Sequence, residues 1–228
     1  MIPLKDDIHS STRPFVTYII LGLNIAVYIA RNEFILGARA FNVFISQFGA
    51  IPYLVFHPAG VSSYLRVISS MFMHAGIMHI AGNMLFLWVF ADNVEDRIGH
   101  VKFLFFYLLC GIAGTLLHCV TSPSSMIPLV GASGAISGVL GAYILLFPKA
   151  RILALIPLGF FMRAIYMPSY LFLGLWFVYQ FLLGFLSMGA GGGGVAYFAH
   201  IGGFVLGVML ALPFKFAGSK GNIEFHVS

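Results

Sequence analysis

The stretch that decides how this sequence folds is VGASGAISG, at residues 130–138. It places Ser133 among small residues, where a polar loop turns into an apolar segment. Ser133 is expected to open a helix, and the unpaired N–H groups and positive end of a helix favour a developing negative charge. His200 lies in a similar setting, FAHIGG at residues 198–203. A hydroxyl alone is a weak nucleophile and needs a base, and an imidazole is costly in hydrocarbon unless it has a partner. Ser133 and His200 would each supply what the other needs.

Composition places the chain in a membrane. Of its 228 residues, 60% are hydrophobic and 8% are charged, whereas an ordinary globular domain carries about 25% charged residues. Apolar runs of spanning length recur along the chain, which predicts an all-α, polytopic six-helix bundle. The net charge of +5 therefore indicates no nucleic-acid partner, and the lipid bilayer is the expected surrounding. The predicted spans cover residues 14–30, 69–91, 101–120, 133–148, 168–187 and 195–213.

The segments between the spans divide a single predicted membrane domain, residues 1–228. Residues 1–13 are polar, and residues 31–67 mix aromatic residues with arginine and proline, which predicts short helices at the membrane interface. Residues 149–167 hold a short apolar piece outside the spans. The glycine run at 189–194 predicts either a mobile loop or a merely flexible connector. Residues 214–228 form a C-terminal tail.

The basic residues are unevenly distributed over the two sides of this topology. Six spans put both termini on one side, and that side holds nine of the twelve basic residues. This is the positive-inside distribution, so both termini are predicted to be cytoplasmic. The nine residues are Lys5, Arg13, Arg97, Lys102, Lys149, Arg151, Arg163, Lys215 and Lys220.

Polar residues from three spans are expected to meet at one depth. The second, fourth and sixth spans run in the same direction, so the first turns that hold His79, Asn83, Ser133 and His200 lie near the outer face. His79 and Asn83 are four residues apart and share a helix face, whereas His74 is about 140° away and is expected to point elsewhere. The pair offers N–H donors for an oxyanion. Equally, it could hold the second span in the bundle by interhelical hydrogen bonds.

Small residues predict where two of the spans touch. They recur along the fourth span, and in the sixth span they share one helix face with His200. Two such faces let helices approach closely in lipid, which would bring the Ser133 hydroxyl within reach of the His200 ring. The residues of this predicted contact are Gly131, Gly134, Gly138, Gly203 and Gly207.

Other intramembrane chemistries have less support. No His-Glu-x-x-His zinc motif occurs. Asp92, Glu95 and Asp96 are predicted to lie in a loop at the end of the second span, so an aspartyl dyad and an acidic third member of a triad are not expected. Cys110 and Cys119 are predicted on one helix about 13 Å apart, too far for a disulfide. The residues therefore favour a Ser133–His200 dyad over a metal site or an aspartyl dyad.

These motifs, in this order, resemble the rhomboid intramembrane serine proteases. The resemblance rests on the spacing of His74, His79 and Asn83, on VEDRIG at residues 94–99, on GASG at 131–134 and on AHIGG at 199–203. It implies a six-helix bundle with Ser133 as nucleophile and His200 as general base. Two departures stand out: Ser137 replaces a frequent aromatic residue beside the catalytic histidine, and Leu65 replaces a frequent tryptophan.

The resemblance also implies the partners and the setting. His79 and Asn83 would help to bind the oxyanion, and the substrates would be single-pass membrane proteins cut in a transmembrane helix, without metal or nucleotide. Separately, a short chain with no extra soluble domain suggests a bacterial protein, so a bacterial inner membrane is the expected location. Two alternatives are a rhomboid-like protein that binds membrane helices without cutting them, and a transporter that relays protons through His79 and His200. The substrate, the cut site and the oligomeric state do not follow from the sequence.

Overall fold

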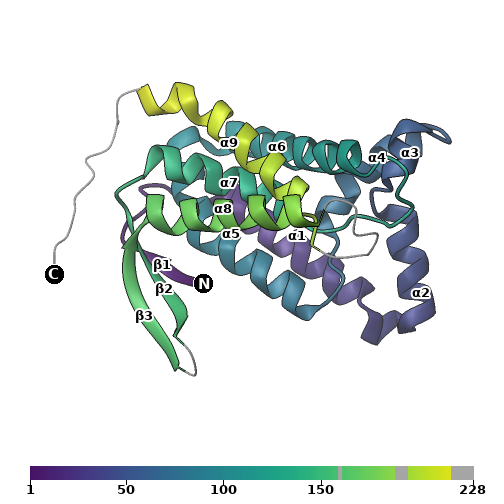
Figure 1. The fold of residues 1–228 in the computed structure, drawn as a ribbon, viewed down its shortest axis with the longest axis horizontal. Coiled ribbons are helices and arrows are strands. Elements are labelled where there is room, and N and C mark those ends of the chain that lie inside the picture. Colours follow the sequence, from purple (N-terminus) through teal and green to yellow (C-terminus); the bar gives the residue numbers. More distant parts are fainter. Residues whose placement is uncertain (159–160, 188–194, 217–228) are drawn as a thin grey trace.

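The computed structural model describes residues 1–158, 161–187 and 195–216, most of them helical (Figure 1). The glycine run at 189–194 and the tail beyond residue 216 lie outside the described residues. The helices are α1 (Phe15–Arg31), α2 (Glu33–Phe48), α3 (Pro52–Phe56), α4 (Val61–Ser69), the 3-10 turn η1 (Ser70–Phe72), α5 (Ile77–Ile98), α6 (His100–Thr121), α7 (Ser133–Leu146), α8 (Ser169–Leu186) and α9 (Tyr197–Phe216).

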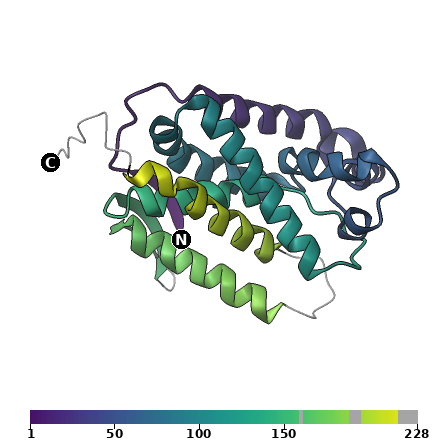
Figure 2. The same cartoon turned by 90° about the horizontal axis from the view of Figure 1, so that it is seen from above.

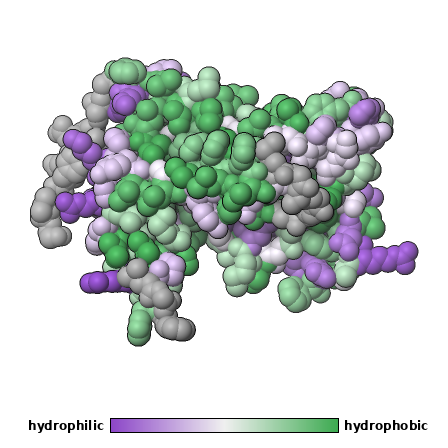
Figure 3. Space-filling model, in the orientation of Figure 1, coloured by the Kyte–Doolittle hydropathy of each residue, from purple (hydrophilic) through white to green (hydrophobic). Residues whose placement is uncertain are grey.

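The predicted polytopic helical bundle is confirmed. Helices α5, α6, α8 and α9 are long and apolar enough to cross a membrane, and α1 with α2 forms a fifth candidate that bends by 86°. Helix α7 is apolar but only 14 residues long, so the count of six spans stays a prediction. On the face shown in Figure 3, apolar side chains cover most of the middle, and many of the hydrophilic residues lie toward the two ends. This distribution suits a protein surrounded by lipid.

Helix α7 lies at the centre of the bundle. Every residue from Gly134 to Tyr143 is buried, because α5, α6, α8 and α9 all contact this helix. Helix α9 lies between α6 and α8 (Figure 2). A short helix that is apolar all round suits this enclosed place, and it puts Ser133 at one end of the central element.

The second predicted span has different ends in the structure. Residues 69–72 belong to α4 and η1, and the extended backbone of Met73 and Gly76 separates them from α5. Helix α5 therefore begins at Ile77 and continues to Ile98. His74 precedes the helix instead of lying on it, so the angle predicted from helical spacing does not apply to it.

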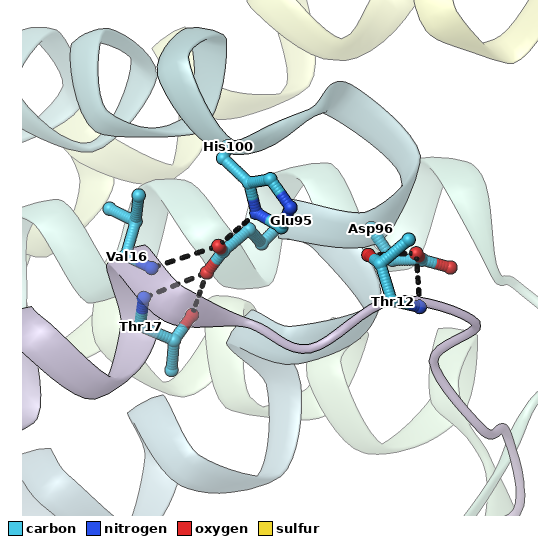
Figure 4. A network of polar contacts seen from close by, with 6 residues as sticks. All are labelled: Thr12, Val16, Thr17, Glu95, Asp96 and His100. Carbon is cyan, nitrogen blue, oxygen red and sulfur yellow. Dashed lines mark hydrogen bonds and ion pairs between the residues drawn. The ribbon is translucent and has the colours of Figure 1, made fainter.

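Two carboxylates near the end of α5 form hydrogen bonds with the start of α1 and with the segment just before it (Figure 4). Helix α1 has no side-chain cap of its own. Glu95, which is fully buried, accepts hydrogen bonds from the N–H groups of Val16 at 2.9 Å and Thr17 at 2.7 Å. Asp96 accepts from the N–H group of Thr12 at 2.9 Å. The loop prediction for Asp92, Glu95 and Asp96 is wrong, because α5 continues to Ile98 and contains all three. Glu95 caps α1, and Asp96 binds the segment just before α1.

A small antiparallel sheet is present that the sequence analysis did not predict. Strands β1 (Ile2–Asp6), β2 (Arg151–Leu158) and β3 (Phe161–Pro168) are paired in that order. Ile152 and Ala154 of β2 are buried in the main core, which explains the apolar piece between the fourth and fifth spans. Since β1 pairs with β2, the N-terminal segment and this connection lie at the same end of the bundle (Figure 1).

Asp6 joins this sheet to the bundle. Its carboxyl accepts hydrogen bonds from the Tyr143 hydroxyl and, at 2.8 Å, from Asn93 Nδ2. Burial raises the pKa of Asp6 from 3.8 to about 7, because desolvation penalises the charged carboxylate. The folded protein therefore holds a proton at Asp6 over a pH range in which the unfolded chain has lost it.

This pKa predicts a pH-dependent stability. The contribution of Asp6 to the free energy of unfolding is fully present below about pH 4 and is lost as the pH rises through about 7. The slope is at most about 1.4 kcal/mol per pH unit. We expect Asp6→Asn to flatten the dependence between pH 5 and pH 7, measured by thermal unfolding in detergent. An unchanged slope in Asp6→Asn would contradict the assignment to this carboxyl.

Candidate active site

A cavity of about 710 Å³ opens between α5, α7, α8 and α9. Its lining is mainly apolar, as is typical of binding sites. Ser133, His200, His79 and Asn83 all line it, and thus four residues that the sequence nominated face one space. Two further polar residues in the lining are Ser137 and Gln180.

Ser133 is the first residue of α7, and Gly131 makes room beside it. Gly131 has a φ of 132°, which favours glycine, and a Cβ at this position would stand 2.7 Å from His79 Nε2. The same Cβ position lies 3.6 Å from Ser133 Oγ. The first N–H groups of α7 have no acceptor within the helix. The glycine therefore lets the His79 ring and the start of α7 come together.

His200, on the first turn of α9, is held by α8. Its Nδ1 lies 2.8 Å from Gln180 Oε1, and the centroids of the His200 and Trp176 rings are 6.0 Å apart. Trp176 and Gln180 are one turn apart on α8 and hence share a face. Both contacts fix the ring from the same neighbouring helix.

His79 packs against His74. Their ring centroids are 5.1 Å apart in an edge-to-face arrangement, so the prediction that His74 points elsewhere is wrong. The extended backbone before α5 brings the His74 ring back to the helix. Among the residues that the structure describes, neither ring nitrogen of His74 has a hydrogen-bond partner, nor has Nδ2 of Asn83.

The two predicted reacting groups share the cavity without a direct bond. In the described ranges, no hydrogen bond joins Ser133 to His200, although such bonds often form only once substrate is bound. Ser137, one turn along α7, donates its hydroxyl to Ser133 O at 2.7 Å. Trp176, from α8, supplies an aromatic ring beside His200 in place of one at position 137.

Glycines bring α7 and α9 into backbone contact. A Cβ on Gly203 would overlap the carbonyl of Gly134, and a Cβ on Gly207 would overlap the backbone of Gly138. Such close backbone contact limits movement of α9 relative to α7, so side chains on the two helices keep fixed positions relative to each other. The close approach places the first turns of α7 and α9, with Ser133 and His200, on the same cavity.

Comparison with known proteins decides the family. Residues 61–215 match the family model of the Rhomboid domain. The chain belongs to the rhomboid family. The match includes every residue of the cavity's polar lining, and it leaves β1, α1, α2 and α3 outside. The rhomboid part is thus the part that builds the cavity.

Known rhomboid proteins align with part of their length. Rhomboid protein 1, mitochondrial, of Saccharomyces cerevisiae is 30% identical over 163 residues, 69% of this chain and 44% of that protein. Rhomboid protease GluP of Bacillus subtilis is 34% identical over 130 residues, 57% of this chain and 24% of that protein. Inactive rhomboid protein 1 of Drosophila melanogaster is 37% identical over 81 residues, 36% of this chain and 6% of that protein. The chain spans less than half the length of these rhomboid proteins.

Two residues of the rhomboid cavity were not nominated by the sequence. Gln180 and Trp176 contact His200 from the fifth predicted span. A signal for Gln180 was present, since it is a single amide in an otherwise apolar segment, SYLFLGLWFVYQFLLGFL, and polar residues inside spans need partners. Trp176 gave no such signal, because a tryptophan in a membrane helix is ordinary.

Proposed function

We propose that this rhomboid protein is an intramembrane serine protease that hydrolyses a peptide bond within a transmembrane helix of a single-pass membrane protein. The observation that supports this most is the cavity, which gathers Ser133, His200, His79 and Asn83 from three helices inside an apolar bundle. Membership of the rhomboid family supports either a protease or a related rhomboid-like role. A nucleophile and a base lining one cavity favour the protease.

The proposed chemistry proceeds through an acyl-enzyme. His200 Nε2 takes the proton of Ser133 as the Oγ atom attacks the carbonyl carbon of the substrate. The protonated ring then gives this proton to the leaving nitrogen, and the C–N bond breaks. A water molecule, deprotonated by His200, attacks the resulting ester and frees Ser133. No metal or other cofactor takes part in these steps.

The oxyanion of the intermediate would be bound by His79, Asn83 and the backbone N–H of Ser133. Within the described residues, Asn83 Nδ2 is buried without a hydrogen-bond partner, which argues against a purely packing role for Asn83. A buried donor without an acceptor costs about 1–3 kcal/mol. An oxyanion that accepts from Asn83 Nδ2 would recover this cost in the transition state.

A rhomboid-like protein that binds helices without cutting them is the rival. The similarity to Inactive rhomboid protein 1 means that the family alone does not decide between the two. A helix-binding protein has no need for a serine and a histidine on one cavity, and this chain has both. Their presence therefore favours hydrolysis.

We further infer that residues 1–228 form one multi-pass membrane domain with both termini in the cytoplasm. Two observations support this topology: the excess of basic residues in the predicted cytoplasmic segments, and the pairing of β1 with β2, which puts two of these segments on one side. The bacterial inner membrane has no support from the comparisons, because the similar proteins include mitochondrial ones as well as bacterial ones.

A serine-reactive fluorophosphonate tests the proposal without a known substrate. We expect the probe to label the purified protein at Ser133, identified by mass spectrometry. His200→Ala should slow labelling by about 100-fold or more, because the base no longer removes the proton, and Ser133→Ala should abolish it. Labelling that persists in Ser133→Ala would mean that the nucleophile is a different residue.

A further inference from the structure

Gln180 is a buried amide in an apolar helix, and its contact is with the proposed general base. The side chain is only 7% exposed, and its Oε1 lies 2.8 Å from His200 Nδ1. A polar group in a membrane helix is costly unless it is paired. The His200 ring is the partner that the structure gives to this amide.

The direction of this hydrogen bond determines the protonation of the ring. An amide oxygen accepts a hydrogen bond and cannot donate one, so Nδ1 of His200 must carry the proton. A neutral imidazole carries one ring proton, which leaves Nε2 with a free lone pair. Nε2 is thus the nitrogen that can take the proton of Ser133.

We propose that Gln180 is the positioning residue of His200: it holds the ring in the Nδ1–H tautomer and, with Trp176, in one orientation. This inference rests on the proposed function, in which His200 is the base. The role is performed from α8, so the dyad on α7 and α9 depends on a third helix. It is the task of the third member of a catalytic triad, carried out here by a neutral amide.

A neutral orienting group has a consequence for the chemistry. In the parts of the chain that the structure describes, no carboxylate forms a hydrogen bond with His200. When the ring becomes positively charged during the reaction, the amide dipole stabilises it less than a carboxylate would. Gln180 therefore acts mainly by fixing tautomer and orientation.

The wild-type protein provides the first test. We expect nitrogen NMR of histidine-labelled protein, with the His200 signal assigned by its loss in His200→Gln, to show a protonated Nδ1 and an unprotonated Nε2. A protonated Nε2 in the wild type would overturn the proposal, whatever the variants do.

Variants provide the second test, with kcat and KM measured on a transmembrane reporter. Gln180→Leu and the nearly isosteric Gln180→Met should lower kcat by about 10- to 100-fold with KM changed less than about twofold, since only the chemical step loses its oriented base. Gln180→Glu keeps an acceptor and should restore kcat to within about fivefold of wild type. Tyr179→Leu is the matched control, because it removes a polar group from the adjacent position on α8, which is 59% exposed.

The outcomes separate this proposal from the proposed function. If Gln180→Leu and Gln180→Met both keep wild-type kcat while Ser133→Ala is inactive, the positioning role is wrong and the protease stands. If Ser133→Ala cuts the reporter as the wild type does, both proposals fail. Loss of kcat in Tyr179→Leu equal to that in Gln180→Leu would also overturn the positioning role.

Discussion

Replacing Ser133 with alanine will abolish cleavage of a transmembrane reporter by the purified protein in liposomes, and replacing His200 with alanine will lower cleavage to the same background. The expected loss in kcat is about 10³- to 10⁶-fold for either variant, because nucleophile and base act as one unit. For the same reason, the double variant should be no slower than either single variant. Fragments identified by mass spectrometry measure the result.

The controls are a serine and a histidine outside the cavity. Ser124→Ala and His57→Ala change exposed residues and should cleave at the wild-type rate. Thermal unfolding in detergent checks that all variants are folded. Wild-type cleavage by both Ser133→Ala and His200→Ala would show that the activity comes from other residues or from a contaminant.

The second large effect is expected where α9 meets α7. In Gly207→Ala, the new methyl group would overlap the backbone of Gly138. Backbone cannot rotate away as a side chain can, so the two helices must separate. We expect a loss of about 2–3 kcal/mol in the free energy of unfolding and a fall in cleavage, because His200 moves with α9.

Gly174→Ala is the matched control for this helix contact. Gly174 lies within α8, and an added Cβ there meets nothing within 4 Å. The substitution should be neutral or stabilise the helix by up to about 1 kcal/mol. Equal unfolding temperatures and equal cleavage in Gly207→Ala and Gly174→Ala would contradict the role assigned to the α7–α9 contact.

The second predicted span differs most from the structure at its start. Hydropathy located the span but placed its start at residue 69, where the structure has the end of α4. The extended residues between η1 and α5 are apolar enough to be included in a span, so hydropathy does not mark the break. As a result, the direction predicted for His74 was wrong, although His79 and Asn83 lie on α5 and line the cavity as their spacing suggested.

The small sheet and the cap of α1 depend on pairing between distant parts of the chain. Residues of β1 and β2 are far apart in the sequence, and so are Glu95 and Thr17. Residues 149–167 have no polar and apolar alternation strong enough to predict a strand. Neither the pairing of two distant strands nor the capping of a helix by a distant carboxylate produces a recognisable pattern in the local sequence.

The sequence by itself determined that the chain is a polytopic helical membrane protein of the rhomboid type, and it nominated Ser133 and His200. These features follow from composition, apolar length and short motifs, which are local properties of the chain. Only the tertiary structure decided that Gln180 and Trp176 contact His200, that His74 packs on His79, and that Glu95 caps α1. Such contacts depend on the rotation and tilt of each helix, which packing against neighbouring helices sets.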